Sequence, residues 1–210
     1  MAKATLYYAH DPMCSWCYGF SPTWQALQEA LIERYSQDQL QIVYLAGGLA
    51  PDSDQPMPAE MRMKLEAIWH RIADELDATF NYEFWQNNTP RRSTYPACRA
   101  AILARHDNKE AAMISAIQRA YYREAQNPSD TDVLLGCAVA IGMNLETFAE
   151  ALNSEETQSQ LLQDITLARS LGLNSFPSFA LVLDDAIHPI PLDYRSTDNM
   201  LRSIATHLSV

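Results

Sequence analysis

The sequence predicts an α/β protein whose sheet is divided in the sequence by a long helical segment. Three observations predict this class. Strand-like runs occur only near the two ends of the chain, and the segment between them carries apolar residues at the three- and four-residue spacings of helices. A C-x-x-C pair stands where the first strand gives way to a helix. The 210 residues, 48% of them apolar, can bury a sizeable core without disulfide bridges.

The first part of the chain predicts a strand, a helix and a second strand. Residues 6–9 form an apolar run typical of a buried strand, and apolar side chains recur at helical spacing over residues 20–35. Residues 40–45 predict the second strand, which ends before Gly47 and Gly48. This order and spacing are those of a parallel crossover unit.

The middle of the chain predicts helices only. It follows a proline-rich loop at residues 51–58, and its apolar stripes cover residues 61–76, 113–121, 133–141 and 161–168. Gly142 and Gly172 stand where the last two stripes end, which is typical of a helix C-terminus. We therefore expect a helical insertion subdomain over residues 60–172, set into a domain formed by residues 1–59 and 173–210.

The last part of the chain predicts a hairpin and a final helix. Residues 179–183 and 188–192 read as two strands joined by a turn at residues 184–186, and two prolines mark the second strand as an edge. A last amphipathic helix is expected from Ser196 or Thr197 to Leu208.

The segment Cys14-Ser15-Trp16-Cys17 is the strongest functional signal. At a helix start the first sulfur faces unpaired backbone N–H groups and the positive end of the helix dipole, which stabilise a thiolate over a thiol. Thiolate is the attacking form in disulfide exchange. We therefore expect Cys14 to be the exposed nucleophile and Cys17 the partly covered resolving thiol. Trp16 is expected to be exposed to a substrate, and Asp11 to be the acid that complements the helix dipole.

Two other interpretations of the cysteine pair are weaker. A C-x-x-C can be half of a zinc site, but Cys98 and Cys137 are single and distant, and no second pair or H-x-x-x-H exists to complete it. The pair could also be an inert structural bridge. We expect no metal, and we expect Cys98 and Cys137 to pack in the core, because each lies on the apolar side of a helical pattern.

Composition excludes several classes of function. A formal charge of -11 argues against a nucleic-acid surface, which needs clustered Lys and Arg. No apolar run is long enough for an export signal or a membrane span. We therefore expect a cytoplasmic protein without a membrane partner. A reactive dithiol in that compartment is expected to cycle between thiol and disulfide.

Three segments together resemble the DsbA-type branch of the thioredoxin fold, and in particular its C-x-x-C-bearing members described as predicted protein-disulfide isomerases. They are residues 11–20 (DPMCSWCYGF), 95–100 (YPACRA) and 174–179 (NSFPSF). The resemblance covers nearly the whole chain and implies a thioredoxin-like fold with a large all-helical insertion. It implies that Pro177 follows a cis peptide bond and faces the cysteines, with Phe176 presenting its backbone to substrate. An ordinary trans proline at the start of a strand is the alternative.

The sequence departs from the family pattern in two places. In thioredoxin and many relatives a buried acid six residues before the first cysteine shuttles protons, but this chain has Tyr8 there. Asp11 and His10 are the nearest substitutes, which is the alternative to the helix-dipole role of Asp11. The dipeptide Ser15-Trp16 matches neither the strongly oxidising nor the reducing pattern, so the direction of electron flow does not follow from it.

We therefore expect a protein-disulfide oxidoreductase that exchanges disulfides through Cys14 and Cys17, with Ser15, Trp16, Phe176 and Pro177 at the substrate site. It needs no organic cofactor. Its expected partners are thiol or disulfide substrates, chiefly proteins, and a reductase or glutathione that resets the pair.

Two rival functions remain. Kappa-class glutathione transferases and 2-hydroxychromene-2-carboxylate isomerases resemble this fold, but they commonly use serine at the position of Cys14. A non-enzymatic thioredoxin-fold binding module is the other, and its sequence sign would be a missing cysteine or proline.

Overall fold

The computed structural model describes residues 4–208, and at its centre is a four-stranded sheet. The strands are β1 (Ala4–His10), β2 (Leu40–Ala46), β3 (Ser178–Leu183) and β4 (Ala186–Ile190), in the order β2-β1-β3-β4. β1 pairs in parallel with β2 and antiparallel with β3, and β4 closes the hairpin with β3. The sheet is therefore built from both ends of the chain, and the predicted α/β class is confirmed.

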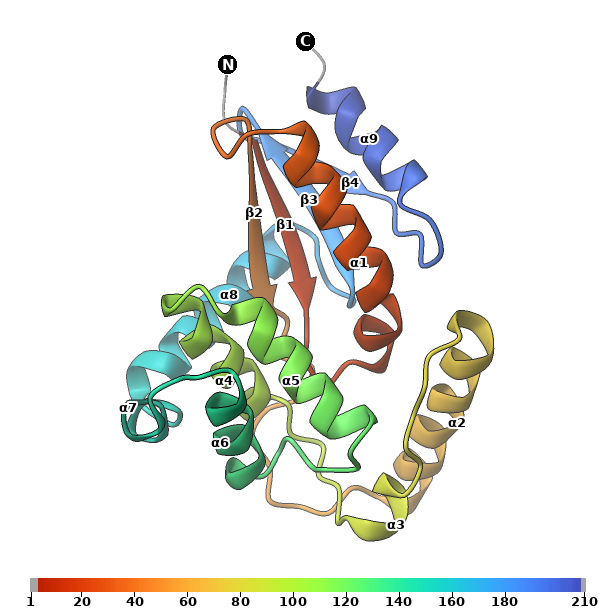
Figure 1. Ribbon diagram of the computed structural model, residues 1–210, viewed down its shortest axis with the longest axis vertical. Helices are drawn as coiled ribbons and strands as arrows, with labels where there is room; N and C mark the ends of the chain where they lie inside the picture. Colours follow the sequence, from red (N-terminus) through yellow and green to blue (C-terminus); the bar gives the residue numbers. More distant parts are fainter. Residues whose placement is uncertain (1–3, 209–210) are drawn as a thin grey trace.

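Helices cover both faces of this sheet (Figure 1). α1 (Ser15–Arg34) and α9 (Asp198–Leu208) pack on one face, where Leu6, Phe20, Phe179 and Ile204 share a buried core. On the other face, Ala168 of α8 (Glu155–Ser170) packs in a second core with residues of β1, β2 and β3. Among residues 4–208 no helix has the length and apolar character to cross a membrane.

The remaining helices lie between β2 and β3 in the sequence and beyond the carboxyl end of β1 in space (Figure 1). They are α2 (Ala59–Leu76), α3 (Phe84–Asn87), α4 (Tyr95–His106), α5 (Glu110–Tyr122), α6 (Thr131–Ala140) and α7 (Leu145–Ala151). The helical insertion is thus present. The division of the chain at residues 60 and 172 into two folding units stays a prediction.

Several boundaries differ from the sequence prediction for identifiable reasons. Cys98 was placed in a helical pattern, but the bounds of its helix, α4, were not predicted, because residues 97–104 are all buried and no single apolar stripe marks them. α3 and α7, of 4 and 7 residues, are too short to show a period. β4 begins at Ala186 rather than residue 188, because Asp184 and Asp185 both take positive φ values, 49° and 63°, and turn the chain in two residues.

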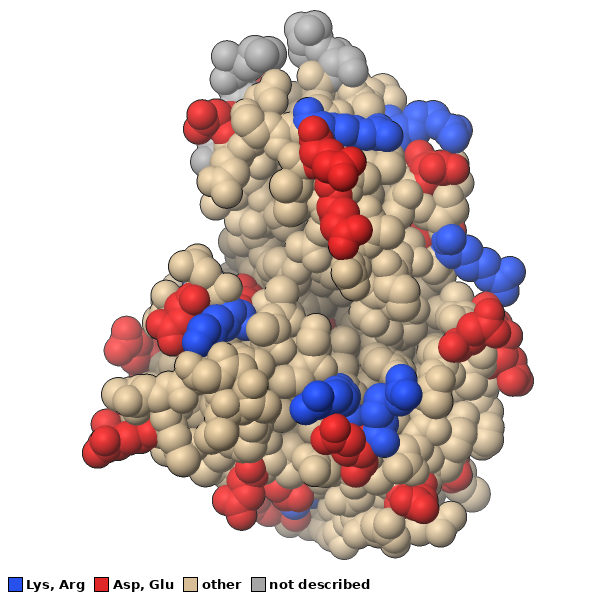
Figure 2. Space-filling view, in the orientation of Figure 1, with Lys and Arg blue, Asp and Glu red and all other residues tan. Residues whose placement is uncertain are grey.

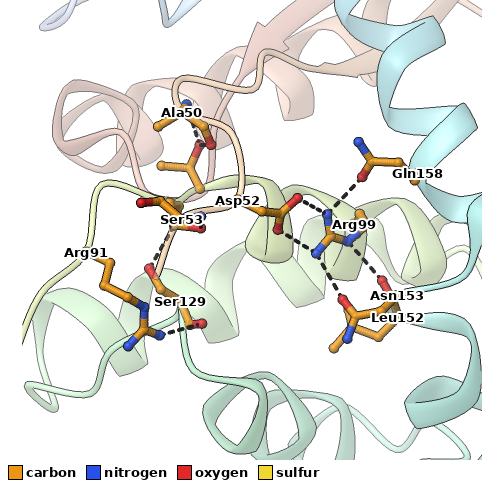
Figure 3. Close-up of polar contacts among 11 residues, drawn as sticks. Ala50, Asp52, Ser53, Arg91, Arg99, Ser129, Leu152, Asn153 and Gln158 are labelled. Atoms are coloured by element: carbon orange, nitrogen blue, oxygen red, sulfur yellow. Dashed lines mark hydrogen bonds and ion pairs between the residues drawn. The ribbon is translucent and has the colours of Figure 1, made fainter. Parts of the chain in front are cut away.

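A buried arginine ties the loop after β2 to the helical insertion (Figure 3). The guanidinium of Arg99, on α4, donates to both carboxylate oxygens of Asp52 at 2.8 and 2.9 Å. It also donates to the side chains of Asn153 and Gln158 and to the backbone carbonyl of Leu152. Charge-assisted bonds to this many partners fix the loop that carries residues 47–53.

Candidate active site

The first cysteine caps α1. Cys14 has an extended backbone, with φ -79° and ψ 115°, and its Sγ accepts a hydrogen bond from the backbone N–H of Cys17 at 3.4 Å. The backbone N–H of Cys14 in turn donates to the carbonyl of Asp11 at 2.9 Å, closing the turn that contains Pro12. A sulfur at this position receives one of the N–H groups that a helix start leaves unpaired.

The loop before β3 faces this sulfur. The Phe176–Pro177 peptide bond is cis, and the thiol of Cys14 donates to the carbonyl of Phe176 at 3.4 Å. Pro177 is buried and has no backbone N–H to offer. Cys14 therefore lies between an N–H of its own helix and a carbonyl from the far end of the chain.

The two cysteines differ in environment. Cys17 is 1% exposed. Cys14 was expected to be exposed, but it is also buried, with 7% exposure, because the loop that carries Phe176 packs against its sulfur. Burial, and next the neighbouring Cys14, raise the pKa of the Cys17 thiol well above its ordinary value. Both are free thiols in this structure. The geometry therefore favours Cys14 as the sulfur that meets a substrate first.

Asp11 does not play the part that the sequence predicted. Its carboxylate is completely buried, where it accepts from the backbone N–H groups of Met13 and Leu49 at 2.9 and 2.8 Å and from the hydroxyl of Thr94 at 2.7 Å. Burial raises the pKa of this carboxyl, and the bonds from Leu49 and Thr94 oppose that rise. The expectation of a helix-dipole acid is wrong, because Asp11 fastens the loops around the cysteines instead.

A cavity of about 210 Å³ opens beside Cys14. Of the predicted site residues, Cys14, Ser15, Trp16 and Phe176 line it, whereas Cys17 and Pro177 are not among its lining residues. Its remaining lining residues are Met13, Leu49, Met57, Leu65, Ile68, Trp69, Arg91, Arg92, Thr94 and Tyr121. We name this cavity the Cys14 groove.

Trp16, which was expected to be exposed, is half-buried in the Cys14 groove and contacts two neighbouring side chains. The Trp16 ring packs edge-on against the ring of Tyr194, with 5.3 Å between ring centres. The guanidinium carbon of Arg71 lies 5.3 Å from the centre of the Trp16 ring. These contacts fix an amphipathic ring at the mouth of the groove.

Sequence reasoning missed the far wall of the Cys14 groove. Leu65 and Ile68 were assigned to a core stripe of α2, yet they face the cavity. Arg91 and Arg92 are adjacent cations in an acidic chain, and this was the one visible signal. Arg91 pairs with Asp130, whereas Arg92 lies beside Tyr121 and lowers the pKa of that phenol against the larger effect of burial.

Cys98 and Cys137 are buried, as expected, with exposures of 0% and 6%. Cys137 packs among apolar residues of α4, α5 and α6. Cys98 has a polar neighbour as well, because its Sγ donates to the carboxylate of Asp11 at 3.4 Å. Burial raises the pKa of both thiols, which keeps them protonated and unreactive.

Gly47 keeps the Cys14 groove in shape, because a Cβ at this position would overlap the ring of Phe176. We expect Gly47→Ala to displace Phe176 and to slow alkylation of Cys14 by roughly 10-fold. The measurement is the rate of labelling with iodoacetamide, followed by peptide mass. Gly136→Ala is the matched control, since a Cβ there meets nothing within 4 Å and helix α6 should gain stability. Equal labelling rates in the two variants would contradict the role given to Gly47.

A mixed sheet in the order β2-β1-β3-β4, with a C-x-x-C pair at the start of α1 and a cis-proline loop facing it, defines a protein of the thioredoxin class. Within that class the helical insertion is the distinguishing feature. The chain belongs to the DSBA-like thioredoxin domain family, whose model matches residues 7–198.

Solved structures of similar proteins cover nearly the whole chain. A candidate protein disulfide isomerase from Nitrosomonas europaea is 25% identical, with a TM-score of 0.84 over 98% of each chain. The cytosolic disulfide reductase DsbM from Pseudomonas aeruginosa is 28% identical, with a TM-score of 0.77 over 97% of this chain and 98% of its own, and a second structure of DsbM contains glutathione.

Two further proteins are more distant. A 2-hydroxychromene-2-carboxylate isomerase shares the fold at 15% identity, with a TM-score of 0.65 over 97% of this chain and 95% of its own. The ClpXP adapter protein SpxH of Halalkalibacterium halodurans is 22% identical over 180 residues, which are 83% of this chain. The chain spans 57% of the length of that curated relative.

Proposed function

We propose that this protein is a thiol–disulfide oxidoreductase in which Cys14 is the nucleophile and Cys17 the resolving thiol. The observation that carries the proposal is the position of Cys14 Sγ, which meets the N–H of Cys17 and the carbonyl of Phe176 and borders an open groove. A helix start leaves N–H groups unpaired that this sulfur can accept, and a thiolate is the attacking form in disulfide exchange. The resolving sulfur is one helical turn away.

The reaction consists of two exchanges. Cys14 thiolate attacks one sulfur of a substrate disulfide, so that a mixed disulfide forms and the other substrate sulfur leaves as a thiolate. Cys17 then attacks Cys14 Sγ, the mixed disulfide breaks, and the second substrate thiolate leaves. Two electrons pass to the substrate and the Cys14–Cys17 disulfide remains. Oxidation of a substrate dithiol is the same sequence in reverse.

The Cys14 groove supplies the substrate site in this proposal. Its apolar wall and the ring of Trp16 suit an apolar side chain beside the reacting sulfur. The backbone of Phe176 is placed to meet an extended substrate, and Ser15 lies at the edge of the same cavity. Arg92 adds a cation that favours a carboxylate near the substrate sulfur.

We further propose that the pair is reset by glutathione or by a reductase in the cytosol, and that no organic cofactor takes part. Likeness along nearly the full chain to a cytosolic disulfide reductase supports this location and the reducing direction. The glutathione in the second DsbM structure supports a glutathione-dependent reset. Two glutathione thiols would supply the two electrons and two protons that passed to the substrate, and they would leave as glutathione disulfide.

The two rival functions have less support. The isomerase structure is alike in fold only, and conjugation or isomerisation has no use for a second thiol next to Cys14. An adapter role of the kind that the name of SpxH describes would require binding without sulfur exchange. Both alternatives predict that loss of Cys17 changes no covalent chemistry.

The two-exchange mechanism predicts opposite outcomes for the two cysteines. Cys17→Ser should stop turnover and accumulate a mixed disulfide at Cys14, because the first exchange proceeds and the second is missing. Cys14→Ser should also stop turnover but trap nothing. The measurement is the intact mass under non-reducing conditions after incubation with a peptide disulfide. The control is Cys98→Ala combined with Cys137→Ala, which should turn over as the parent does. Equal trapping by Cys14→Ser and Cys17→Ser would overturn the assignment.

A further inference from the structure

The two sulfurs of the pair open on different cavities. Cys14 lines the Cys14 groove, whereas Cys17 lines a separate cavity of about 550 Å³ between α1 and α5. Tyr8, Tyr44 and Gln118 are among the residues that share this second cavity with Cys17. Figure 2 shows a hollow near the middle of the face on which α1 and α5 lie in Figure 1, above a group of Lys and Arg side chains. We name it the α1–α5 cavity.

Cys17 has a proton to lose during the second exchange. Burial and the neighbouring Cys14 raise the pKa of its thiol, so at neutral pH the sulfur carries a proton when it begins to attack. That proton must leave as the bond to Cys14 Sγ forms, because the thiolate is the competent nucleophile. The substrate occupies the Cys14 groove at this stage and covers the route past Cys14. The α1–α5 cavity is the open route.

His10 and Asp11, the two titratable residues between Tyr8 and Cys14 in the sequence, are not placed to accept the proton of Cys17 and pass it to solvent. The carboxylate of Asp11 already accepts from four donors, which are Met13, Leu49, Thr94 and Cys98. The ring of His10 is 1% exposed and is not among the residues that line the α1–α5 cavity. Neither group connects Cys17 with solvent.

Tyr8 does connect Cys17 with solvent. Its side chain and that of Cys17 line the α1–α5 cavity together, and Cys17 is close enough to raise the pKa of the Tyr8 phenol, after the larger effect of burial. The ring is held rigidly, stacked on Phe179 with 4.7 Å between ring centres and packed against Trp24 at 4.5 Å. A neutral phenol has one donor and two acceptor sites, so it can receive a proton from one side while it releases one on the other.

We propose that Tyr8 is a catalytic residue of the second exchange, and that its hydroxyl passes the proton of Cys17 to water in the α1–α5 cavity. As Cys17 Sγ bonds to Cys14 Sγ, the bond between Cys14 and the substrate sulfur breaks and the substrate leaves as a thiolate. The thiol proton of Cys17 moves to the oxygen of Tyr8, and the hydroxyl proton of Tyr8 moves to a water molecule. Tyr8 ends as it began, and no oxidant or reductant beyond the substrate is needed. The inference rests on the proposed exchange of disulfides.

The other charged and titratable groups around this route are few. From β2, Tyr44 faces Tyr8 with 5.5 Å between ring centres, and its hydroxyl accepts from the indole N–H of Trp24 at 3.1 Å. From α1, Cys14 and Tyr18 lie on the same side, and His10 of β1 lies 5.3 Å from Tyr8 between ring centres. From α5 and its end, Arg119 and Arg123 border the cavity and favour release of a proton from it.

The test separates the two exchanges with a chromogenic aryl disulfide, which releases one coloured thiolate at each step. Reduced protein and an excess of the disulfide are mixed by stopped flow at pH 7. We expect Tyr8→Phe to keep the first phase within about 2-fold of the parent and to slow the second on the order of 100-fold. At a pH above the ordinary pKa of a thiol, the second phase of Tyr8→Phe should approach that of the parent, because hydroxide then removes the proton of Cys17. Phenylalanine retains the ring packing on Phe179 and Trp24.

Tyr44→Phe is the matched control, since it removes a hydroxyl from the same cavity without touching Cys17, and its second phase should equal that of the parent. Ser115→Trp, at an exposed position lining the cavity, should slow the second phase by filling the route with an indole. A parent-like second phase in Tyr8→Phe, or a deficit that stays constant with pH, would overturn the inference. A parent protein that releases no second coloured thiolate would instead overturn the proposed function, so the two failures are distinguishable.

Discussion

Replacing Asp11 by alanine is expected to lower the free energy of unfolding by about 3 kcal/mol. The N–H groups of Met13 and Leu49 and the thiol of Cys98 would lose their acceptor inside the protein, and the hydroxyl of Thr94 would keep only a longer bond to the carbonyl of Ala50 at 3.4 Å. Each buried donor left without a partner costs roughly 1–3 kcal/mol. Part of that cost is offset, because the variant no longer has to bury a carboxylate. Burial disfavours the charged form of Asp11, as its raised pKa indicates.

The measurement is urea unfolding at pH 7, compared with Asp54→Ala as a control of equal charge change at an exposed loop position. Asp54→Ala should stay within about 0.5 kcal/mol of the parent. Asp11→Ala should also loosen the wall of the Cys14 groove, because Leu49 lines that cavity and is held by the carboxylate. Equal stability of the two variants would show that the buried carboxylate is not what joins these loops.

Protonation of His10 is expected to make the stability of the protein fall in acid. His10 is 1% exposed, and neither ring nitrogen has a hydrogen-bond partner within residues 4–208. Burial, and next the positive charge of Arg105, lower the pKa of His10 from 6.5 to about 3. Between these two values the unfolded chain binds a proton that the folded chain excludes.

The sign follows from this proton balance. A folded pKa below the unfolded one means that the contribution of His10 to stability is fully present above pH 6.5 and is lost as the pH falls toward 3. At about pH 4 the loss should reach about 3 kcal/mol. His10→Phe removes the titrating group and keeps a ring against Tyr8 and Tyr44. Its urea midpoint should therefore fall less steeply between pH 7 and 4 than that of the parent, and identical slopes would refute the prediction.

Local patterns were enough for much of the fold and for the centre of the site. β1, β2, β3 and the four long apolar stripes were predictable because each has a regular period and a clear boundary. The C-x-x-C pair at a helix start was predictable because its chemistry depends on a neighbour three residues away. The bounds of α4 were not predictable, since a helix whose residues 97–104 are all buried has no polar face to define its period.

The partners that surround Cys14 could not be derived from spacing. Phe176 reaches Cys14 across 162 positions of the chain, and only the family resemblance pointed to it. Met57, Trp69 and Tyr121 come from three separate segments to the same groove, and each also fits a core position by composition. Whether an apolar side chain lines a cavity or fills a core depends on the packing of other elements against it.

The sequence by itself determined the α/β class and the place of the C-x-x-C pair at a helix start, because these follow from local backbone geometry and from the pattern of neighbouring residues. Only the tertiary structure decided that Asp11 fastens loops instead of complementing a dipole, and that Cys14 and Cys17 line separate cavities. The reason is physical: the protonation and reach of a buried side chain depend on which distant groups desolvate it or bond to it. For Tyr8 and Asp11 those groups lie on β2, at the N-cap and in the first turn of α4, and in the loop after β2.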